Sequence, residues 1–255
     1  MSGFSEKLDA ASVASILARV ARRRPRVHCL TNTVAQNVTA NMLLAVGAVP
    51  SMASHPDEVE PVAAGAGAIL INLGTLSLEG ERAIPKLVGV ARQRRIPLVL
   101  DPVFVELSPL RLRLVGDVLA LFDVLVRGNA TEMAVLEPLF ALRRDIVRVT
   151  TGAVDRIETE DRALSVAHGH ELMSKVTGLG CASSALVAAC RAVEPDSVIA
   201  AAAALTAYGI AGEIAAERAA GPGSFAVALI DALATLDPQT LQARMAGARN
   251  HGDRT

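Results

Sequence analysis

The chain has 255 residues, enough for one large α/β domain or two small ones. Hydrophobic residues make up 51% of it but aromatic residues only 2%, so its core must come from aliphatic packing. The formal net charge is −1 and no basic block is interleaved with aromatic residues, which excludes nucleic acid as a partner.

Neither the cysteines nor the apolar runs point outside the cell. Cys29, Cys181 and Cys190 show no CxxC spacing, which argues against a disulfide framework or a zinc site. The first 23 residues are too polar for a signal sequence, and we find no apolar run of the ~18 residues that a membrane span requires. We therefore expect a cytoplasmic protein with no membrane segment.

Strand-like and helix-like segments alternate along the chain. Runs of Val, Ile and Leu predict strands, and apolar residues spaced three or four apart predict helices. Strands are expected at residues 27–30, 47–52, 68–73, 98–101, 124–126 and 146–149, with a small antiparallel pair at 156–158 and 164–167. Helices are expected at 5–24, 31–46, 56–66, 77–95, 109–122, 130–142, 196–218 and 225–236, with a loose polar tail past 244.

This alternation predicts an α/β fold, in which helices cover both faces of a mostly parallel sheet. We find no linker and no internal repeat in the sequence. Residues 1–255 are therefore expected to form a single domain.

The most distinctive stretch is residues 175–184, KVTGLGCASS, which precedes an alanine-rich apolar run. Gly178 and Gly180 allow a tight loop and a close approach of a ligand to the main chain. The free N–H groups of the helix that follows, together with its dipole, form an anion site. Cys181 lies at the mouth of this site, where we expect a lowered thiol pKa. The alternative is an ordinary glycine loop with a buried cysteine.

Polar residues also gather where the predicted strands end. Asp101, Arg127, Asn129 and Thr151 each follow a strand, and Glu132 lies one helical turn after Asn129. Open α/β sheets bind ligands along this rim. Carboxylates, an arginine and an anion-binding loop suit nucleotide phosphates with Mg²⁺, although no Walker sequence is present. Taken singly, each residue is equally well explained as a cap or a surface ion pair.

Eight motifs that follow one another along the chain resemble the hydroxyethylthiazole kinase family. They are NTVAQN at 32–37, GAVPSMA at 47–53, NLGTL at 72–76, DPV at 101–103, RGNATE at 127–132, HGHELM at 168–173, VTGLGC at 176–181 and GPGSF at 221–225. The resemblance covers roughly residues 8 to 237. It implies a ribokinase-like three-layer α/β/α fold and transfer of the ATP γ-phosphoryl group to the hydroxyl of 5-(2-hydroxyethyl)-4-methylthiazole in thiamine salvage.

The resemblance also implies roles for the substrate-binding residues. Met52 and Gly178 match residues that contact the thiazole, while Arg127 and Thr151 match contacts to ATP. Their position at strand ends leads us to add two amides, Asn129 to the ATP-binding set and Asn32 to the substrate-binding set. The family is typically a homotrimer that holds its substrate between subunits, so we expect the same of this chain.

The implied catalytic group is a cysteine. Cys181 falls where this family has cysteine and most ribokinase relatives have an aspartate base, and Gly178, Gly180 and Cys181 together would form the anion hole. Asp101 and Glu132 match acids near Mg²⁺ and the phosphates. A thiol is a modest base at neutral pH, so we expect phosphate positioning and the anion hole to supply most of the rate.

The chain departs from the family at three places. Bulkier residues at 104–107 replace a Gly-Ala-Gly-Ala segment, where they could crowd the phosphates; Leu179 replaces a threonine; and the segment between Glu132 and Thr150 is shorter by roughly a helix and its loop. Two alternatives to an active thiazole kinase follow. One is a related kinase with a shifted small-alcohol or pyrimidine substrate, and the other is a catalytically weak paralogue that binds thiazole or thiamine as a sensor.

Overall fold

Strand pairing defines the centre of the molecule. The structure, a computed structural model, describes residues 8–252 except 121, 122 and 144. Its eight strands in this described part form one sheet in the order β2-β1-β3-β4-β5-β6-β7-β8. The first six pair in parallel, and β7 and β8 extend the sheet as an antiparallel hairpin. The strands are β1 Arg26–Leu30, β2 Val49–Ser51, β3 Ala68–Asn72, β4 Leu98–Asp101, β5 Val124–Asn129, β6 Val147–Thr151, β7 Asp155–Glu158 and β8 Ala163–Val166.

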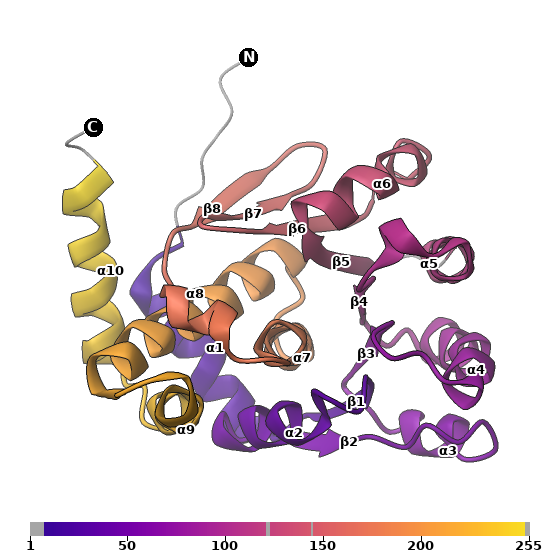
Figure 1. Cartoon of the computed structure of the whole chain (residues 1–255), viewed down its shortest axis with the longest axis horizontal. Helices are drawn as coiled ribbons and strands as arrows, with labels where there is room; N and C mark the ends of the chain where they lie inside the picture. Colours follow the sequence, from indigo (N-terminus) through magenta and orange to yellow (C-terminus); the bar gives the residue numbers. More distant parts are fainter. Residues whose placement is uncertain (1–7, 121–122, 144, 253–255) are drawn as a thin grey trace.

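Helices cover both faces of this sheet, as Figure 1 shows. One layer contains α1 Ala10–Arg23, α2 Gln36–Ala45, α7 Leu179–Arg191, α8 Ser197–Arg218 and α9 Pro222–Ala234. The other contains α3 Val59–Ala63, α4 Leu78–Arg94, α5 Pro109–Leu119 and α6 Ala130–Phe140. Short 3-10 turns, η1 Val105–Leu107 and η2 Glu171–Lys175, lie in the loops. This arrangement confirms the predicted α/β/α fold with a mostly parallel sheet.

The strand sequences explain why both layers form. Every residue of β3 is buried, as expected for a parallel strand that is covered on both sides. Because successive side chains point to opposite faces, Ala68 and Leu70 pack with the α7–α8 layer, while Ile69 and Ile71 pack with the α4–α5 layer. The small alanine side chains of α7 and α8 let these helices approach the sheet and each other closely.

Helix α8 concerns the prediction that the chain has no apolar run long enough to span a membrane. Its 22 residues are long and apolar enough to cross a membrane by length and composition, contrary to what we expected from the sequence. However, 89% of its apolar window is buried inside the protein. A buried, alanine-rich helix at the centre of one layer is typical of a core helix.

The C-terminal region differs from the sequence prediction. The tail that we expected to be loose past residue 244 belongs to a further helix, α10 Pro238–Gly252. Asp237 accepts a hydrogen bond from the Thr240 backbone N–H at 2.8 Å, and Pro238 occupies the first helical position, where its missing N–H costs nothing. Helix α9 likewise begins at Pro222, three residues before the predicted start.

Three helices in the N-terminal third of the chain are shorter than predicted. Helix α2 begins at Gln36 rather than at Thr31, because residues 31–35 form the turn that carries Asn32. Helix α3 spans only Val59–Ala63. Helix α1 begins at Ala10 after an Asp9 cap, and the part of its predicted range at 5–7 lies outside the described residues.

Candidate active site

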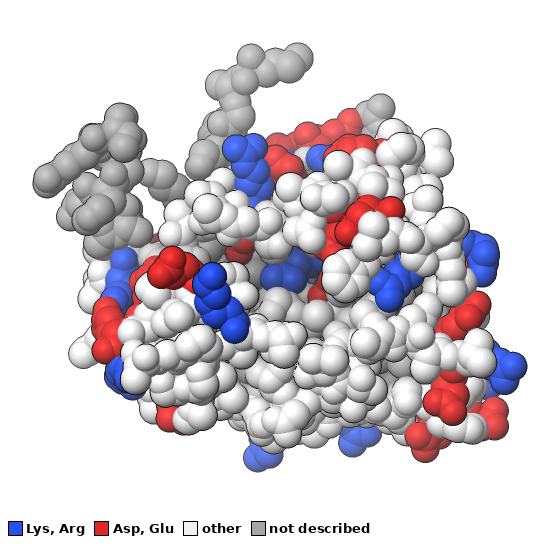
Figure 2. All heavy atoms as spheres, in the orientation of Figure 1, with Lys and Arg blue, Asp and Glu red and all other residues white. Residues whose placement is uncertain are grey.

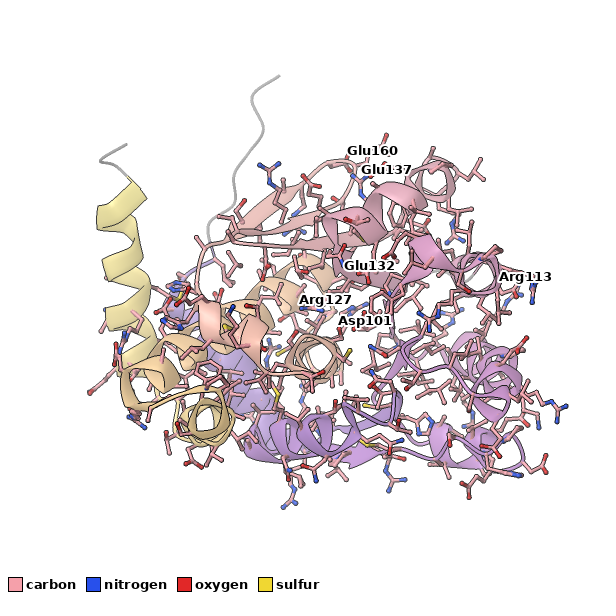
Figure 3. The ribbon with its side chains drawn as sticks, viewed as in Figure 1. Asp101, Arg113, Arg127, Glu132, Glu137 and Glu160 are labelled. Atoms are coloured by element: carbon pink, nitrogen blue, oxygen red, sulfur yellow. The ribbon has the colours of Figure 1, made fainter. Side chains whose placement is uncertain are left out.

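The candidate site lies along the carboxyl-end rim of the sheet. Strands β3, β4, β5 and β6 end there at Asn72, Asp101, Asn129 and Thr151, and the first turn of α7 faces them. Figure 3 places Asp101, Arg127 and Glu132 together near the middle of the molecule, while the labelled Arg113, Glu137 and Glu160 lie towards its edge. The prediction that polar residues at strand ends gather at one rim is therefore confirmed.

Asp101 is the most constrained of these groups. Only 3% of it is exposed, and its Oδ2 accepts hydrogen bonds from Asn72 Nδ2 and from Ser184 Oγ, both at 2.8 Å. Burial raises the pKa of Asp101 to about 6, although the Arg127 charge and the Ser184 hydrogen bond act in the opposite direction. At neutral pH Asp101 is therefore mostly ionised.

Glu132 is held in place by the backbone around it. Its Oε2 accepts from the Asn129 N–H at 2.8 Å, and Asn129 in turn caps α6 by accepting from the Thr131 and Glu132 N–H groups. Glu132 Oε1 accepts from the Phe104 N–H at 3.0 Å, which ties the start of α6 to the loop after β4. This reciprocal cap follows from an asparagine placed three residues before a glutamate.

The carboxylates of Asp101 and Glu132 suit Mg²⁺ better than a metal ion whose ligands must all come from the protein. Among the described residues no group of three or more His, Cys, Asp and Glu side chains could hold a metal ion. Mg²⁺ requires less, because it keeps several waters and is bound by one or two carboxylates together with phosphate oxygens. The charge of Glu132 acts on Asp101, so the two carboxylates lie in the same part of the rim.

Arg127 and Thr151 border a cleft of about 620 Å³ beside these acids. Arg127 is only 8% exposed, its Nη1 donates to Ser184 Oγ at 3.3 Å, and its Nε is buried with no hydrogen-bond partner among the described residues. Thr151 Oγ1 donates to the Gly128 carbonyl. In the space-filling view the molecule is hollowed near the middle of this face (Figure 2). A buried guanidinium with an unused donor suits an anionic ligand.

The glycine loop has the predicted form, with one difference. Gly178 has φ +83°, the left-handed conformation that glycine adopts readily, and it immediately precedes α7. Gly180 is an ordinary helical residue instead, and a Cβ built on it would meet nothing within 4 Å. Open space at Gly180 lets a ligand approach the first turn of α7, where the backbone N–H groups lack helical partners.

Our prediction of a lowered pKa for Cys181 is wrong in sign. Burial raises the pKa of the Cys181 thiol, and the negative charge of Asp101 raises it further. The amides of Asn72 and Asn32 and the charge of Arg127 lower it by less. Cys181 is therefore a neutral thiol at physiological pH, because burial and the Asp101 charge outweigh the groups that lower its pKa.

Asn32 and Met52, two of the three predicted substrate-binding residues, lie at different parts of the rim. Asn32 is buried, and its Nδ2 donates to Cys181 Sγ at 3.3 Å and to Asn72 Oδ1 at 2.9 Å. Met52 follows β2, the outermost parallel strand, and is partly buried against the α7–α8 core. The structure thus brings Asn32 into contact with Cys181, while Met52 lies at the same edge of the sheet on a neighbouring strand.

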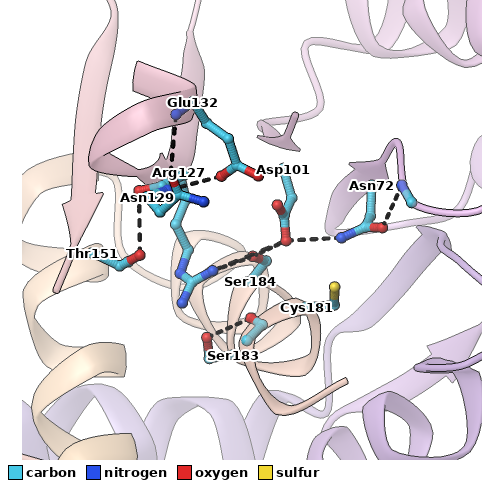
Figure 4. Close-up of polar contacts among 12 residues, drawn as sticks. Asn72, Asp101, Arg127, Asn129, Glu132, Thr151, Cys181, Ser183 and Ser184 are labelled. Atoms are coloured by element: carbon cyan, nitrogen blue, oxygen red, sulfur yellow. Dashed lines mark hydrogen bonds and ion pairs between the residues drawn. The ribbon is translucent and has the colours of Figure 1, made fainter. Parts of the chain in front are cut away.

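Sequence reasoning missed Asn72 and Ser184, which both bond Asp101. Asn72 ends β3 in the same way as Asp101 ends β4, so its position at a strand end was the available signal. Ser184 is fully buried within the alanine-rich α7, where a serine must find a polar partner. Both residues belong to the polar contacts drawn in Figure 4.

The structure shows where the three departures from the family pattern lie, namely residues 104–107, Leu179 and the shortened segment after Glu132. Phe104 and Leu107 are 55% and 74% exposed, and they border a separate hollow with Ser108 and Arg111 rather than the Arg127 cleft. Leu179 is fully buried in the core, and its carbonyl accepts from the Tyr208 hydroxyl. Only residues 141–146 connect α6 to β6 in the shortened region.

Comparison with known proteins gives one consistent result. The Hydroxyethylthiazole kinase family matches residues 17–140 and 137–239. The chain is 42% identical over 232 residues to a probable hydroxyethylthiazole kinase from Agrobacterium fabrum, covering 91% of this chain and 93% of the relative. It is 41% identical over 249 residues to the hydroxyethylthiazole kinase from Granulibacter bethesdensis, with 89% and 91% covered.

Solved structures agree with the sequence comparison. The hydroxyethylthiazole kinase protein from Pyrococcus horikoshii superposes with a TM-score of 0.83 at 36% identity, covering 90% of this chain and 95% of that one. A ribokinase-like superfamily protein from Enterococcus faecalis superposes with a TM-score of 0.65 at 13% identity, covering 92% and 96%, which supports the fold alone. The chain therefore belongs to the hydroxyethylthiazole kinase family.

Proposed function

We propose that this protein transfers the γ-phosphoryl group of ATP to the primary hydroxyl of 5-(2-hydroxyethyl)-4-methylthiazole. The observation that carries the proposal is the buried cluster of Asp101, Arg127 and Ser184 at the first turns of α7, beside a cleft of about 620 Å³. A cation, an acid and free backbone N–H groups meet there at one rim. This combination stabilises the charge on a phosphoryl group in transfer.

In the proposed reaction the hydroxyl oxygen of the thiazole bonds to the γ-phosphorus. The bond between that phosphorus and the β–γ bridging oxygen breaks, and ADP leaves. Arg127, Thr151 and Asn129 hold the nucleotide, and Gly178, Gly180 and Cys181 surround the transferred group. The unpartnered Nε of buried Arg127 supports the nucleotide role, because a ligand oxygen would satisfy it.

The hydroxyl also has to lose its proton. We assign Cys181 to the position next to the reacting hydroxyl, as the residue match implies. Since burial and Asp101 raise the pKa of its thiol, Cys181 is mostly protonated at neutral pH, and only its small thiolate fraction can accept the hydroxyl proton and become the neutral thiol. Electrostatic stabilisation of the transferred group therefore supplies most of the rate, with a smaller contribution from the thiol.

Asp101 and Glu132 are the residues that we propose for Mg²⁺. The ion would neutralise the charge of the phosphates when bound. Both oxygens of Glu132 accept backbone hydrogen bonds in this structure, so its position is fixed by α6 and by the loop after β4. Asp101 keeps one oxygen, Oδ1, without a hydrogen bond from the described residues.

We propose that Asn32, Met52 and Gly178 contact the thiazole and that the protein works as a cytoplasmic homotrimer of a single kinase domain. Exposed apolar side chains in the Asn32 turn and on α2 support a subunit contact there: Val34 in the turn is 54% exposed, and Leu44 near the end of α2 is 56% exposed. Sedimentation or mass photometry measures the oligomeric state. A stable monomer at micromolar concentration would contradict this part of the proposal.

The test is ADP formation by the purified protein with ATP and Mg²⁺, with and without the thiazole. Thiazole-dependent ADP supports the proposal. Arg127→Ala should raise the KM for ATP, and Cys181→Ala should lower kcat while thiazole binding stays nearly intact. An unchanged KM for ATP in Arg127→Ala would contradict the nucleotide assignment.

A second function has one observation in its favour. The exposed Phe104 and Leu107 give the loop after Asp101 an apolar surface, which suits a kinase with a shifted small-alcohol or pyrimidine substrate. A screen of phosphoryl acceptors separates the two: greater kcat/KM for a pyrimidine alcohol than for the thiazole would favour the second function. Thiazole binding by calorimetry without ADP formation would instead indicate a sensor.

A further inference from the structure

A continuous chain of side-chain hydrogen bonds, buried except at its Cys181 end, crosses the site, and Asn72 lies at its centre. From Asn72 the chain runs in one direction through Asn32 to Cys181, and in the other through Asp101 to Ser184 and Arg127. Asn72 is only 3% exposed, and on the adjacent strands β3 and β4 it is the register partner of Asp101. The sheet itself therefore holds the Asn72 amide beside the Asp101 carboxylate (Figure 4).

The orientation of the Asn72 amide is fixed by its partners. Its Oδ1 accepts from Asn32 Nδ2 at 2.9 Å and from the Gly74 N–H at 3.0 Å, so its Nδ2 points to Asp101. A flipped amide would place an oxygen against the carboxylate and would lose both donors. A Cβ built on Gly74 would lie 3.0 Å from Asn72 Oδ1 and 2.9 Å from Asn32 Nδ2, so the absent side chain at Gly74 makes this packing possible.

On the Asp101 side, Asn72 selects which oxygen a ligand meets. Oδ2 accepts from both Asn72 Nδ2 and Ser184 Oγ, each at 2.8 Å. Within the described part of the chain Oδ1 receives no hydrogen bond. The carboxylate is therefore held with Oδ1 as its available oxygen.

On the Cys181 side, the effect passes through Asn32. An amide NH₂ group carries two hydrogens, and Asn32 Nδ2 gives one to Asn72 Oδ1 at 2.9 Å and one to Cys181 Sγ at 3.3 Å. The Asn32 Oδ1 is occupied as well, by the Ala35 N–H at 2.9 Å. Without the Asn72 oxygen, the Asn32 amide would lose one of the contacts that aim its second hydrogen at the sulfur.

We propose that Asn72 is a positioning residue for phosphoryl transfer, which fixes the Asp101 carboxylate directly and the Cys181 thiol through Asn32. The proposal rests on the proposed function of this site. It explains why an uncharged amide, rather than an apolar side chain, ends the fully buried strand β3. One side chain thereby sets the separation between the acid and the thiol, two groups that arrive from different parts of the sequence.

Two substitutions at Asn72 test the proposal. Asn72→Asp keeps the size but replaces the donor to Asp101 with an oxygen that repels it, and Asn72→Ala removes the amide without adding charge. We expect kcat to fall by about tenfold to a hundredfold, the usual scale for misplaced groups, with KM for ATP and thiazole changing by less than about threefold. Asn72→Asp should be the more severe of the two.

The control is Asn41→Ala, because among the described residues the Asn41 side chain bonds only Asn37, which is exposed on α2. It should match the wild type in kcat. If the kcat of Asn72→Ala returns to the wild-type value when the assay is run well below the Tm of the variant, Asn72 has a purely structural role. That result would overturn the proposal. Should Asn72→Asp fail to fold, Asn72→Ala alone decides the outcome.

A second readout does not depend on turnover. Cys29 and Cys190 are buried, so alkylation of the native protein by iodoacetamide reports on Cys181. We expect its rate to change at least about threefold in Asn72→Ala and to stay at the wild-type value in Asn41→Ala. An unchanged rate would overturn the link to Cys181. If the wild type shows no kinase activity but Asn72→Ala still changes the rate of Cys181 alkylation, the proposed function is refuted. The inference that Asn72 positions Cys181 would then still stand.

Discussion

Two turns with a left-handed backbone border the site, and they reach that conformation in different ways. Gly178, before α7, has φ +83°, and Phe104, after β4, has φ +57°. At Gly178 the residue type itself permits the conformation. Phe104 carries a bulky Cβ-bearing side chain in a region that such residues rarely adopt.

Neighbouring side chains hold the Phe104 turn. The peptide unit between Val103 and Phe104 is bonded at both ends: Arg111 Nη1 donates to the Val103 carbonyl at 2.6 Å, and the Phe104 N–H donates to Glu132 Oε1 at 3.0 Å. The Arg111 guanidinium also lies 5.8 Å from the centre of the Phe104 ring. Arg111 and Glu132 lie in the first turns of α5 and α6, so these two helices fix the turn.

The difference shows how a strained turn can survive without glycine. A left-handed non-glycine residue costs roughly 1–2 kcal/mol, whereas a hydrogen bond to a charged group contributes about 1.5–3 kcal/mol. Two such bonds are enough to offset the strain at Phe104. Gly178 needs no comparable support, but it depends on the absence of a side chain.

The largest effect is expected at Gly178. In Gly178→Ala the new Cβ would lie 3.2 Å from the Ala35 Cα and 3.3 Å from Val38 Cγ1, and the backbone strain adds to this contact. We expect a loss of at least about 1–2 kcal/mol in the free energy of unfolding, measured by urea titration, and a clear fall in kcat.

The matched control for stability is Gly180→Ala, two residues away. Gly180 is helical and a Cβ there meets nothing within 4 Å, so the free energy of unfolding should stay equal or rise by about 0.5–1 kcal/mol. Equal losses in both variants would show that crowding at α7, rather than the backbone angle, controls this loop.

The hydrogen bonds from Arg111 to the Val103 carbonyl and from the Phe104 N–H to Glu132 form a clamp on the Phe104 turn. A smaller effect is expected when the Arg111 bond of this clamp is removed. Arg111→Met removes the bond to the Val103 carbonyl and should lower the free energy of unfolding by about 0.5–1.5 kcal/mol, because water replaces part of the lost bond. Arg113→Met is the control, since the Arg113 side chain is 65% exposed on the same helix and forms a long ion pair with Glu81 at 3.8 Å. The two variants should differ clearly in urea midpoint; coinciding midpoints would argue against the clamp.

These two turns also mark what the sequence could predict. The glycine loop before α7 was predictable because its signal is local, namely two glycines ahead of an apolar run. Polar residues at the ends of β4, β5 and β6 were predictable for the same reason, since parallel strands bring their carboxyl ends to one edge. The clamp on Phe104 was not, because Arg111 and Glu132 lie on two different helices and meet the turn only after folding.

The errors in the site have the same origin. The raised pKa of Cys181 depends on how deeply α7 is buried and on the approach of Asp101, and neither is visible in ten residues of sequence. The role of Asn72 depends on the register of β3 against β4. Helix α10, by contrast, had a local signal in Asp237 and Pro238, which its polar composition outweighed in our prediction.

The smallest effect is expected from relieving the strain directly. Phe104→Gly removes the penalty for φ +57°, and little burial is lost because the ring is 55% exposed. The greater freedom of glycine in the unfolded chain opposes this gain by about 0.5–1 kcal/mol, so the free energy of unfolding should stay equal or rise by less than about 1 kcal/mol. In the Phe104→Gly background, Arg111→Met should cost less than in the wild type, because the turn no longer needs the clamp. Additive effects in this double-mutant cycle, measured by urea titration, would show that Arg111 and the strained turn are independent.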